Sequence, residues 1–415
     1  MDNEDFEDLP PVMGSYSKSS PLLDLPPAMP AGMDQPPGNG SQLLEDEAGS
    51  EMASNPANEM TAEKEEWDCQ FTYDVTWTKT PDGHDKMNEY VLLETLGSGS
   101  FGRVRLAERQ EGERPFKSYA IKMMSKLRLI KQRDFVHTGE GGMKAVTALD
   151  KVRAEVDVLR RLWHRNVVLL MEVIEDIEGE GQELCLVMEA LLGGCPMKYV
   201  AEENVFRSPA TGGVCGEALA RRHFRDLCKG LRYLRELGVC HRDIKPDNLL
   251  LTGEGVLRIT DFGCAVRLEP ERRAEGTLVD SAGTYLFYSP ECCSGEPYSG
   301  YSNDLWAATI CLYIFLYGIL PFQCEGIEPL FEMIQNEPID LPLESLNADL
   351  ASVIQNLFQK QAEMRMSIFQ VLESRWLFDE QEETSNSSEN KSQPQTGISQ
   401  GQEDGKDEPF EGIAF

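Results

Sequence analysis

The run VCHRDIKPDNLLL (239–251), followed closely by Asp261-Phe262-Gly263, constrains this chain more than any other feature. It places two carboxylates, an amide and a lysine at spacings that are typical of phosphoryl-transfer sites. Such transfer depends on positioning and on charge neutralisation, and Mg²⁺ takes hard oxygen ligands. Asn248 and Asp261 are therefore expected to bind Mg²⁺. Asp243 is expected to orient the attacking hydroxyl and accept its proton, and Lys245 to balance the charge of the transferred group.

A glycine-rich segment precedes this run. In YVLLETLGSGSFGRVRLAE (90–108), alternating apolar residues predict a strand, which Gly97, Gly99 and Gly102 interrupt and which resumes after them. The usual alternative for G-x-G-x-x-G, a dinucleotide-binding turn, opens a helix instead. A second strand favours a hairpin that covers phosphates, because glycines let backbone amides approach an anion. Val104 is then expected to cover an adenine ring.

The apolar strand YAIKMM (119–124) carries one lysine, Lys122. After a glycine-rich hairpin, this residue fits the lysine that holds the α- and β-phosphates of a nucleotide. The helical pattern of ALDKVRAEVDVLRRLW (148–163) supplies Glu155 as its carboxylate partner. Taken singly, Lys122 and Glu155 each also fit a plain surface charge. The order of all these motifs along the chain favours the ion pair.

The net charge of −32 is concentrated near the ends of the chain. Residues 1–88 contain 19 acidic and 4 basic residues, and residues 379–415 contain 10 and 2. We expect both to be disordered acidic regions, 1–88 and 379–415, around one folded domain at 89–378. WDCQFTYDVTW (67–77) is the exception, an alternating aromatic stretch that can pack on the domain as a strap. The acidity argues against nucleic acid and against a membrane as partners.

LWAATICLYIFLYGILPF (305–322) has no charged residue and is just long enough to span a bilayer. Asp304 abuts its start, and Gly318 and Pro321 interrupt its end, so a buried central helix fits better than a membrane span. The eleven cysteines show no metal-ligand spacing. Reduced thiols indicate an intracellular protein, which we expect in the cytoplasm, with the nucleus as an alternative.

Residues 89–378 resemble a eukaryotic protein kinase domain along its full length, through the glycine segment, Lys122, Glu155 and the motifs around Asp243 and Asp261. The resemblance implies an α+β, bilobal protein kinase fold, with a small β-rich N-lobe that carries the Glu155 helix and a large helical C-lobe. It implies ATP and Mg²⁺ as cofactors. HRDIKPDN, with its lysine, is similar to serine/threonine kinases rather than tyrosine kinases.

The resemblance also assigns an ATP site. LVMEAL (186–191) looks like the hinge between the lobes, with Met188 as the gatekeeper and with backbone groups of Glu189 and Leu191 directed toward adenine. Leu250 is expected to form the floor of this pocket. The residues expected to contact ATP are Leu96, Gly97, Ser98, Gly99, Ser100, Phe101, Gly102, Val104, Ala120, Lys122, Met188, Glu189, Leu191 and Leu250.

DSAGTYLFYSPE (280–291) matches the end of the family's activation segment. Thr284 matches the threonine that bonds to the catalytic aspartate, and Glu291 matches a glutamate that pairs with an arginine, here Arg365. Two positions depart from the family pattern: Tyr285 stands where proline is usual, and Ser289 stands where alanine is usual.

Arg242 lies beside the catalytic aspartate, where a cation binds a phosphorylated residue of the activation segment by charge-assisted hydrogen bonds. Ser281 aligns with the activating site of related kinases and is the first candidate for phosphorylation. Thr277 is the second candidate. An exposed serine without a regulatory role is the alternative interpretation of Ser281.

KMNEYVLLETLGSGSFGRV (86–104), GGCPMKYV (193–200) and PECCSGEPYSGYSNDLWA (290–307) are most similar to calcium/calmodulin-dependent kinase kinases, and especially to the plant geminivirus Rep-interacting kinases. These families phosphorylate the activation-loop threonine of AMP-activated-type kinases. The resemblance therefore implies a protein substrate that is the catalytic subunit of another kinase. The acidic tail at 379–415 has no basic amphipathic helix, so calmodulin is not expected to bind.

The long connection between Lys122 and Glu155, SKLRLIKQRDFVHTGEGGMKAVTA (125–148), corresponds to an insert that this group of kinases shares. It lacks the prolines of the animal insert. A substrate-docking segment and a solvated loop both remain open.

Three other functions are considered. A pseudokinase scaffold keeps the fold and loses catalytic residues, but no catalytic position is missing here. A small-molecule kinase is disfavoured because Thr284, and Glu291 with Arg365, fit a segment that reads a protein substrate. A serine/threonine kinase of another signalling pathway remains the main alternative.

Overall fold

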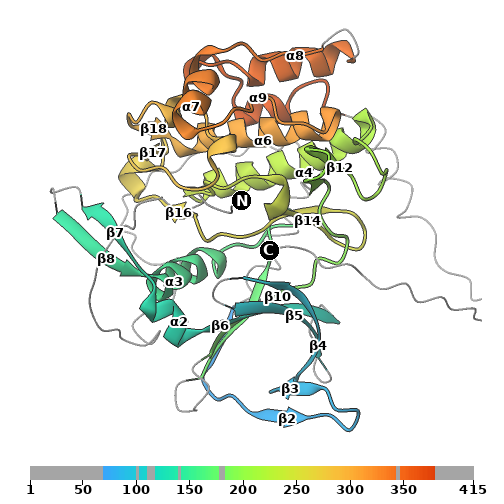
Figure 1. Cartoon of the computed structure of the whole chain (residues 1–415), viewed down its shortest axis with the longest axis vertical. Helices are drawn as coiled ribbons and strands as arrows, with labels where there is room; N and C mark the ends of the chain where they lie inside the picture. The colour runs from blue at the N-terminus through green and yellow to red at the C-terminus, as the bar shows by residue number, and fades with distance from the viewer. Residues whose placement is uncertain are drawn as a thin grey trace, which may run out of the picture.

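The structure is a computed structural model that describes residues 69–99, 102–109, 117–138, 142–176, 183–342 and 346–378, with backbone alone for residues 135–138 and 142–144. A curled β-sheet forms one lobe and a mainly helical layer forms the other (Figure 1). The predicted α+β, bilobal fold is confirmed. Residues 1–68 of the predicted N-terminal tail (1–88) and the predicted tail at 379–415 lie outside the described residues, as do Ser100 and Phe101 of the glycine segment.

An eight-stranded sheet forms the N-lobe, in the order β1-β9-β10-β6-β5-β4-β3-β2. Its strands are β1 (Gln70–Thr72), β2 (Trp77–Lys79), β3 (Asp85–Met87), β4 (Tyr90–Ser98), β5 (Gly102–Arg109), β6 (Ser118–Ser125), β9 (Leu170–Glu175) and β10 (Glu183–Glu189). β1 runs parallel to β9, and the other neighbouring strands are antiparallel. β4 and β5 form the predicted glycine-rich hairpin, since the chain continues as a strand after Gly102.

The predicted boundary at residue 88 is wrong for residues 69–88, which form the first three strands of the sheet. The hydroxyl of Thr72 donates to Oε1 of Glu172 at 2.5 Å, and the hydroxyl of Tyr90 donates to Oε2 at 2.7 Å. Cys69 and Met87 are buried. The acidic composition of residues 1–88 led to the boundary at 88, although the alternating stretch 67–77 was expected to pack on the domain. The described part of that stretch, residues 69–77, does so through β1 and β2.

The connection between Lys122 and Glu155 has regular structure. It contains α2 (Lys126–Lys131) and a hairpin of β7 (Arg133–Thr138) and β8 (Gly142–Thr147), which projects beside α3 (Ala148–Leu159; Figure 1). Thr147 caps α3: its Oγ1 accepts the backbone N–H of Asp150 at 3.1 Å, and its own N–H donates to the carboxylate of Asp150 at 2.8 Å. The segment 125–148, for which a solvated loop was one alternative, thus contains a helix followed by a hairpin.

The C-lobe is built from helices around one long central helix. Its helices are α4 (Glu217–Glu236), α5 (Pro290–Cys293), α6 (Gly300–Tyr317), α7 (Ile327–Asn336), α8 (Ala348–Leu357) and α9 (Ile368–Leu372), with short 3₁₀ turns η2 (Pro246–Asn248), η3 (Pro270–Arg272), η4 (Tyr285–Phe287) and η6 (Ala362–Met364). Two-stranded pairs join β11 (Lys198–Val200) to β12 (Val205–Arg207), β13 (Val239–Cys240) to β16 (Val266–Arg267), β14 (Leu249–Leu251) to β15 (Leu257–Ile259) and β17 (Thr277–Leu278) to β18 (Tyr298–Ser299).

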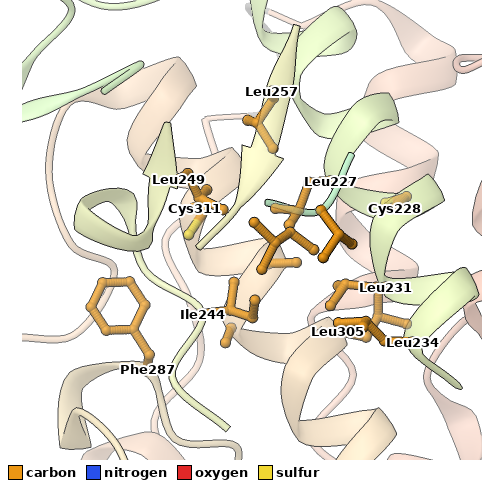
Figure 2. Close-up of a cluster of buried hydrophobic side chains, with 14 of the residues drawn as sticks. Leu227, Cys228, Leu231, Leu234, Ile244, Leu249, Leu257, Phe287, Leu305 and Cys311 are labelled. Carbon is orange, nitrogen blue, oxygen red and sulfur yellow. The ribbon is translucent and has the colours of Figure 1, made fainter. Parts of the chain in front are cut away.

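The apolar run that begins at Leu305 is confirmed as a buried central helix. α6 is buried along nearly all of its length and ends at Gly318, whose φ of +70° is the left-handed conformation that glycine adopts without strain. Among the described residues, no helix is long and apolar enough to cross a membrane. Figure 2 shows Leu305 of α6 beside Leu231 and Leu234 of α4 in the hydrophobic core, and Cys311 of α6 beside Leu249 of β14.

Arg365 ties the end of the activation segment to the C-lobe core. Its two Nη atoms lie 2.6 and 2.9 Å from the carboxylate oxygens of Glu291, its Nη1 also donates to Oγ of Ser302 at 2.8 Å, and its guanidinium stacks over the ring of Trp306. The side chain of Arg365 is 1% exposed. This is the pairing predicted from the sequence, and it is a fork-to-fork geometry that only arginine can make.

We expect Glu291→Gln to destabilise the domain strongly, because it leaves the buried guanidinium of Arg365 without a counter-charge. Removing one partner of a buried ion pair costs about 3–5 kcal/mol. The matched control is Glu296→Gln in the following turn, an exposed side chain whose change is expected to stay within about 0.5 kcal/mol. Urea unfolding followed by tryptophan fluorescence measures both. Equal midpoints for the two variants would contradict the structural role of the pair.

Candidate active site

A cavity of about 1450 Å³ lies under the glycine-rich hairpin and above the catalytic loop. Its lining includes the predicted ATP residues Leu96, Gly99, Gly102, Val104, Ala120, Lys122, Met188, Glu189, Leu191 and Leu250, together with Glu155, Lys245, Asn248, Asp261 and Thr284. Gly97 and Ser98 belong to β4 but do not line it. The structure therefore brings residues that are up to 188 positions apart, from Leu96 to Thr284, to one site.

Among the lining residues that the sequence did not indicate, Met124, Val168 and Thr260 lie close in sequence to predicted site residues or to the elements that carry them. Met124 stands two residues after Lys122 on β6, and side chains two apart share a face of a strand, so the pattern could have indicated it. Thr260 directly precedes Asp261. Val168 lies between α3 and β9, where no local pattern marks it.

Lys122 and Glu155 form the predicted ion pair. Nζ of Lys122 on β6 lies 2.9 and 3.2 Å from the two carboxylate oxygens of Glu155 on α3. Glu155 is 5% exposed. Burial alone lowers the pKa of Lys122, but the charges of Glu155 and Asp261 outweigh it and raise the pKa above its usual value. The ammonium group is therefore held charged in the cavity, as phosphate binding requires.

The catalytic loop is held by a carboxylate of α6. The backbone N–H groups of His241 and Arg242 donate to Asp304 at 2.7 and 2.8 Å. The His241 ring packs edge-on against Phe262, with centroids 4.8 Å apart, and its Nε2 lies 2.9 Å from the carbonyl oxygen of Thr260. These contacts join the loop that carries Asp243 to the segment that carries Asp261.

Asp243 is the centre of a hydrogen-bonded cluster. Its Oδ1 accepts the backbone N–H and the hydroxyl of Thr284, at 2.9 and 2.8 Å. Its Oδ2 lies 2.8 Å from Nζ of Lys245 and accepts a hydrogen bond from the amide of Asn248 at 3.0 Å. Nζ of Lys245 also donates to Oγ1 of Thr284 at 2.9 Å, which closes the cluster. The predicted bond between Thr284 and the catalytic aspartate is thus present.

The charge state of Asp243 follows from these contacts. Burial raises the pKa of Asp243, but the hydrogen bond and charge of Lys245, with the hydrogen bond of Thr284, hold the pKa below its usual value. The group is a carboxylate at neutral pH.

The activation segment also packs closely against the catalytic loop at Gly283. This residue has φ of +99°, and a Cβ there would lie 2.2 Å from the carbonyl oxygen of Arg242, so glycine is required.

Asn248 and Asp261 are suited to hold Mg²⁺. The amide nitrogen of Asn248 is used on Asp243, which leaves its oxygen Oδ1 for a metal. Asp261 has φ of +56° and lines the same cavity. Within the described ranges, no group of three or more His, Cys, Asp or Glu side chains is arranged to bind a metal. Two protein ligands, completed by phosphate and water oxygens, match the preference of Mg²⁺.

The hinge residue Glu189 has a side chain engaged in the fold. Its Oε1 accepts the backbone N–H of Leu169 at 3.0 Å, and its Oε2 lies 3.0 Å from Nη2 of Arg258 on β15. Nη1 of Arg258 also donates to the carbonyl oxygen of His164 at 3.2 Å. Any contact of Glu189 with a nucleotide therefore falls to its backbone, as predicted.

Arg242 has a partner in the described structure that the sequence did not indicate. Its Nη1 lies 2.9 Å from Oδ2 of Asp280, and its Nε donates to the carbonyl oxygen of Cys264 at 2.7 Å. The neighbouring Ser281 is exposed, and Thr277 lies in β17, where its hydroxyl donates to Glu275 at 3.3 Å. A carboxylate thus occupies the position that was predicted for a phosphate.

The two departures from the family pattern have structural roles. Ser289 is fully buried and caps α5, because its Oγ accepts the backbone N–H of Cys292 at 3.3 Å. Tyr285 is 46% exposed, and its ring packs edge-on against Tyr288 and Phe331 with centroids 5.4 and 5.9 Å apart. The tyrosine therefore adds an aromatic surface next to Thr284.

Sequence comparisons are consistent with this geometry. The family model described as "Protein kinase domain" matches residues 90–377. The chain is 35% identical to the serine/threonine-protein kinase GRIK1 of Arabidopsis thaliana over 306 aligned residues. The aligned region covers 74% of this chain and 71% of GRIK1. GRIK2 of the same plant is 35% identical over 301 residues, covering 72% and 67%. A calcium/calmodulin-dependent protein kinase kinase of Caenorhabditis elegans is 31% identical over 345 residues, covering 80% and 60%.

We expect Asp243→Asn to lower ATP-dependent phosphate transfer by at least about 10²-fold, the usual contribution of a positioned general base. Lys122→Met is expected to have a similar effect, through loss of the phosphate contact. Glu236→Gln, at an exposed position on α4, is the control and should leave the rate unchanged. Release of ADP in a coupled assay measures all three. Wild-type turnover in Asp243→Asn would contradict this assignment, and inactive wild-type protein would favour a scaffold.

Proposed function

The chain belongs to the protein kinase family and is a serine/threonine protein kinase, and we propose that it phosphorylates the activation-loop threonine of an AMP-activated-type kinase. The observation that carries this proposal is the similarity to the calcium/calmodulin-dependent protein kinase kinase of Caenorhabditis elegans. The two proteins are 31% identical over a region that covers 80% of this chain. The resemblance of residues 86–104, 193–200 and 290–307 to upstream kinases supports the same substrate. We also propose a cytoplasmic location, with the nucleus as an alternative.

The arrangement around Asp243 supports transfer to a hydroxyl of a protein. Bound ATP with Mg²⁺ supplies the phosphoryl group and neutralises part of its charge. Asp243 stays ionised, so it can orient a serine or threonine hydroxyl and take its proton. Lys245 stands between Asp243 and Thr284, where its charge stabilises the group being transferred. Lys122, fixed by Glu155, holds the phosphates that remain.

The direct experiment combines the purified protein, ATP and Mg²⁺ with the catalytic subunit of an AMP-activated-type kinase. We expect phosphate on the activation-loop threonine of that subunit, mapped by mass spectrometry. The control is the same subunit with its activation-loop threonine changed to alanine, which should receive none. Phosphate that persists on the control, or absence from both subunits, would reject the upstream role and favour a kinase of another signalling pathway.

We further propose that Ser281 is the activating phosphosite, with Thr277 as the second candidate. Ser281 is exposed and follows Asp280, so a phosphate on it lies one residue from the present partner of Arg242. The Asp280 carboxylate binds the guanidinium of Arg242 before any phosphate is added to Ser281. Because Arg242 is also bonded to the backbone at Cys264, it connects the start of the activation segment to Asp280. The unphosphorylated kinase should therefore have basal activity.

The change Asp280→Asn removes the charge of this contact and keeps its shape. In phosphatase-treated protein we expect kcat to fall about two- to fivefold, because the side chain of Asp280 is 67% exposed and an exposed ion pair is worth about 0.2–1 kcal/mol. Glu271→Gln, at an exposed position of the same segment, is the control and should have no effect.

In phosphorylated protein, Ser281→Ala is expected to lower the rate sharply. Unchanged turnover in Ser281→Ala would remove Ser281 from the switch and direct attention to Thr277.

A further inference from the structure

A small hairpin stands at one end of the cavity, on the C-lobe side. It consists of β11 (Lys198–Val200) and β12 (Val205–Arg207), which follow the hinge in sequence. The backbone N–H of Phe206 donates to the carbonyl oxygen of Gly318, the residue that ends α6, at 2.6 Å. A Cβ at Gly318 would lie 2.8 Å from the carbonyl oxygen of Phe206. The hairpin is thus packed closely against the end of the central helix and has a fixed position.

Tyr199 on this hairpin is an exposed aromatic side chain that is nevertheless held in place. It is 44% exposed. Its ring packs against Phe206 with centroids 5.1 Å apart, and its hydroxyl donates to Oδ1 of Asn204 at 2.7 Å. Asn204 has φ of +54° in the turn and donates to Gln323 at 3.4 Å. A ring that is already ordered loses little conformational entropy when a ligand covers it.

The cavity wall that the C-lobe contributes includes apolar and aromatic side chains beside the polar Asn204 and Gln323. Tyr199, Phe206, Leu320 and Leu286 line it, and Lys245 and Thr284 lie where the wall meets the catalytic cluster. None of these six residues is among the predicted ATP contacts, which belong to the glycine-rich hairpin, β6 and the hinge. This part of the cavity is therefore left for the group that receives the phosphate.

The rim of the same wall is acidic. Asp247 and Glu325 line the cavity and are exposed. An apolar floor beside two carboxylates fits an extended peptide with an apolar side chain next to a lysine or arginine. The aromatic surface of Tyr285 lies on the activation segment, where the residue after the acceptor is expected. The hairpin wall is thus assigned to residues that precede the acceptor.

We propose that the β11–β12 hairpin, with Leu320, is a substrate-recognition site for an apolar side chain that precedes the phosphorylated serine or threonine, and that Asp247 and Glu325 favour a basic residue beside it. The inference rests on the proposed function only in taking a peptide segment of a protein as substrate. It does not depend on that protein being an AMP-activated-type kinase.

The test uses a peptide library with one central threonine in which each preceding position is varied in turn. Wild-type protein should prefer leucine, isoleucine or methionine at one of these positions. Tyr199→Ala should lower kcat/KM about tenfold for peptides with that apolar residue and leave peptides with alanine there unchanged, because it removes the aromatic surface against which the apolar residue is buried. Tyr199→Phe removes the hydroxyl alone and should keep the preference. Glu325→Gln should reduce the preference for lysine and arginine and leave the preference for the apolar residue unchanged.

The matched control is Phe369→Ala on α9. Phe369 is an aromatic side chain with the same 44% exposure as Tyr199, but it does not line the cavity. It should leave every preference unchanged. An equal loss for apolar and alanine peptides in Tyr199→Ala, or an unchanged preference at every preceding position, would overturn the proposal.

A binding readout is available that does not depend on turnover. Among the cysteines of the described residues, Cys324 is exposed, whereas the others are buried or half-buried, and Cys324 lines this end of the cavity. A peptide with the preferred apolar residue should slow the reaction of Cys324 with a maleimide, and its alanine counterpart should not. Cys324→Ser defines the background from other thiols. Equal rates with both peptides would contradict occupancy of this wall.

The two proposals fail in different ways. If the AMP-activated-type subunit is not phosphorylated but Tyr199→Ala still loses the apolar preference, the recognition site stands and the upstream role falls. If the subunit is phosphorylated but Tyr199→Ala keeps the wild-type preferences in the peptide library, the upstream role stands and the recognition site falls.

Discussion

The contact on which the catalytic centre depends is made by Asp304, a carboxylate of the central helix that is 3% exposed. It accepts the backbone N–H groups of His241 and Arg242. Arg242 has φ of +68°, and a non-glycine residue in this conformation costs about 1–3 kcal/mol. Two hydrogen bonds to a buried carboxylate hold this strained turn. Burial raises the pKa of Asp304 despite these bonds, which shows how far the group is removed from water.

From this turn the chain directs two side chains to two different tasks. Arg242 reaches the activation segment and meets Asp280, while the next residue, Asp243, faces Thr284 and Lys245. The activation segment is therefore held at two points by adjacent residues of one strained loop. Order in the segment and the position of the catalytic carboxylate are coupled through the backbone. The ion pair of Glu291 with Arg365 fixes the far end of the same segment on the C-lobe core.

Much of the fold followed from local patterns, and the parts that did not share a cause. The glycine-rich hairpin, the helix of Glu155 and the buried helix after Asp304 have periodicity or motifs that mark them. For residues 70–87, only the alternating aromatic stretch 67–77 gave a signal, and their strands form because β9 and β4 offer free edges to them. The hairpin between α2 and α3 was unmarked. Short strands depend on their partners, so a composition averaged over 88 residues could not reveal them.

The sequence by itself determined the proposed catalytic set: Lys122, Glu155, Asp243, Asn248 and Asp261 stand in motifs whose spacing is typical of phosphoryl transfer. Tertiary structure alone decided the contacts of Arg242 with Asp280, and of Glu189 with Arg258, and it alone brought Tyr199 and Leu320 to the wall beside Thr284. The physical reason is that a motif encodes groups that must act together on one ligand, whereas these residues come together through packing between segments that no local pattern records.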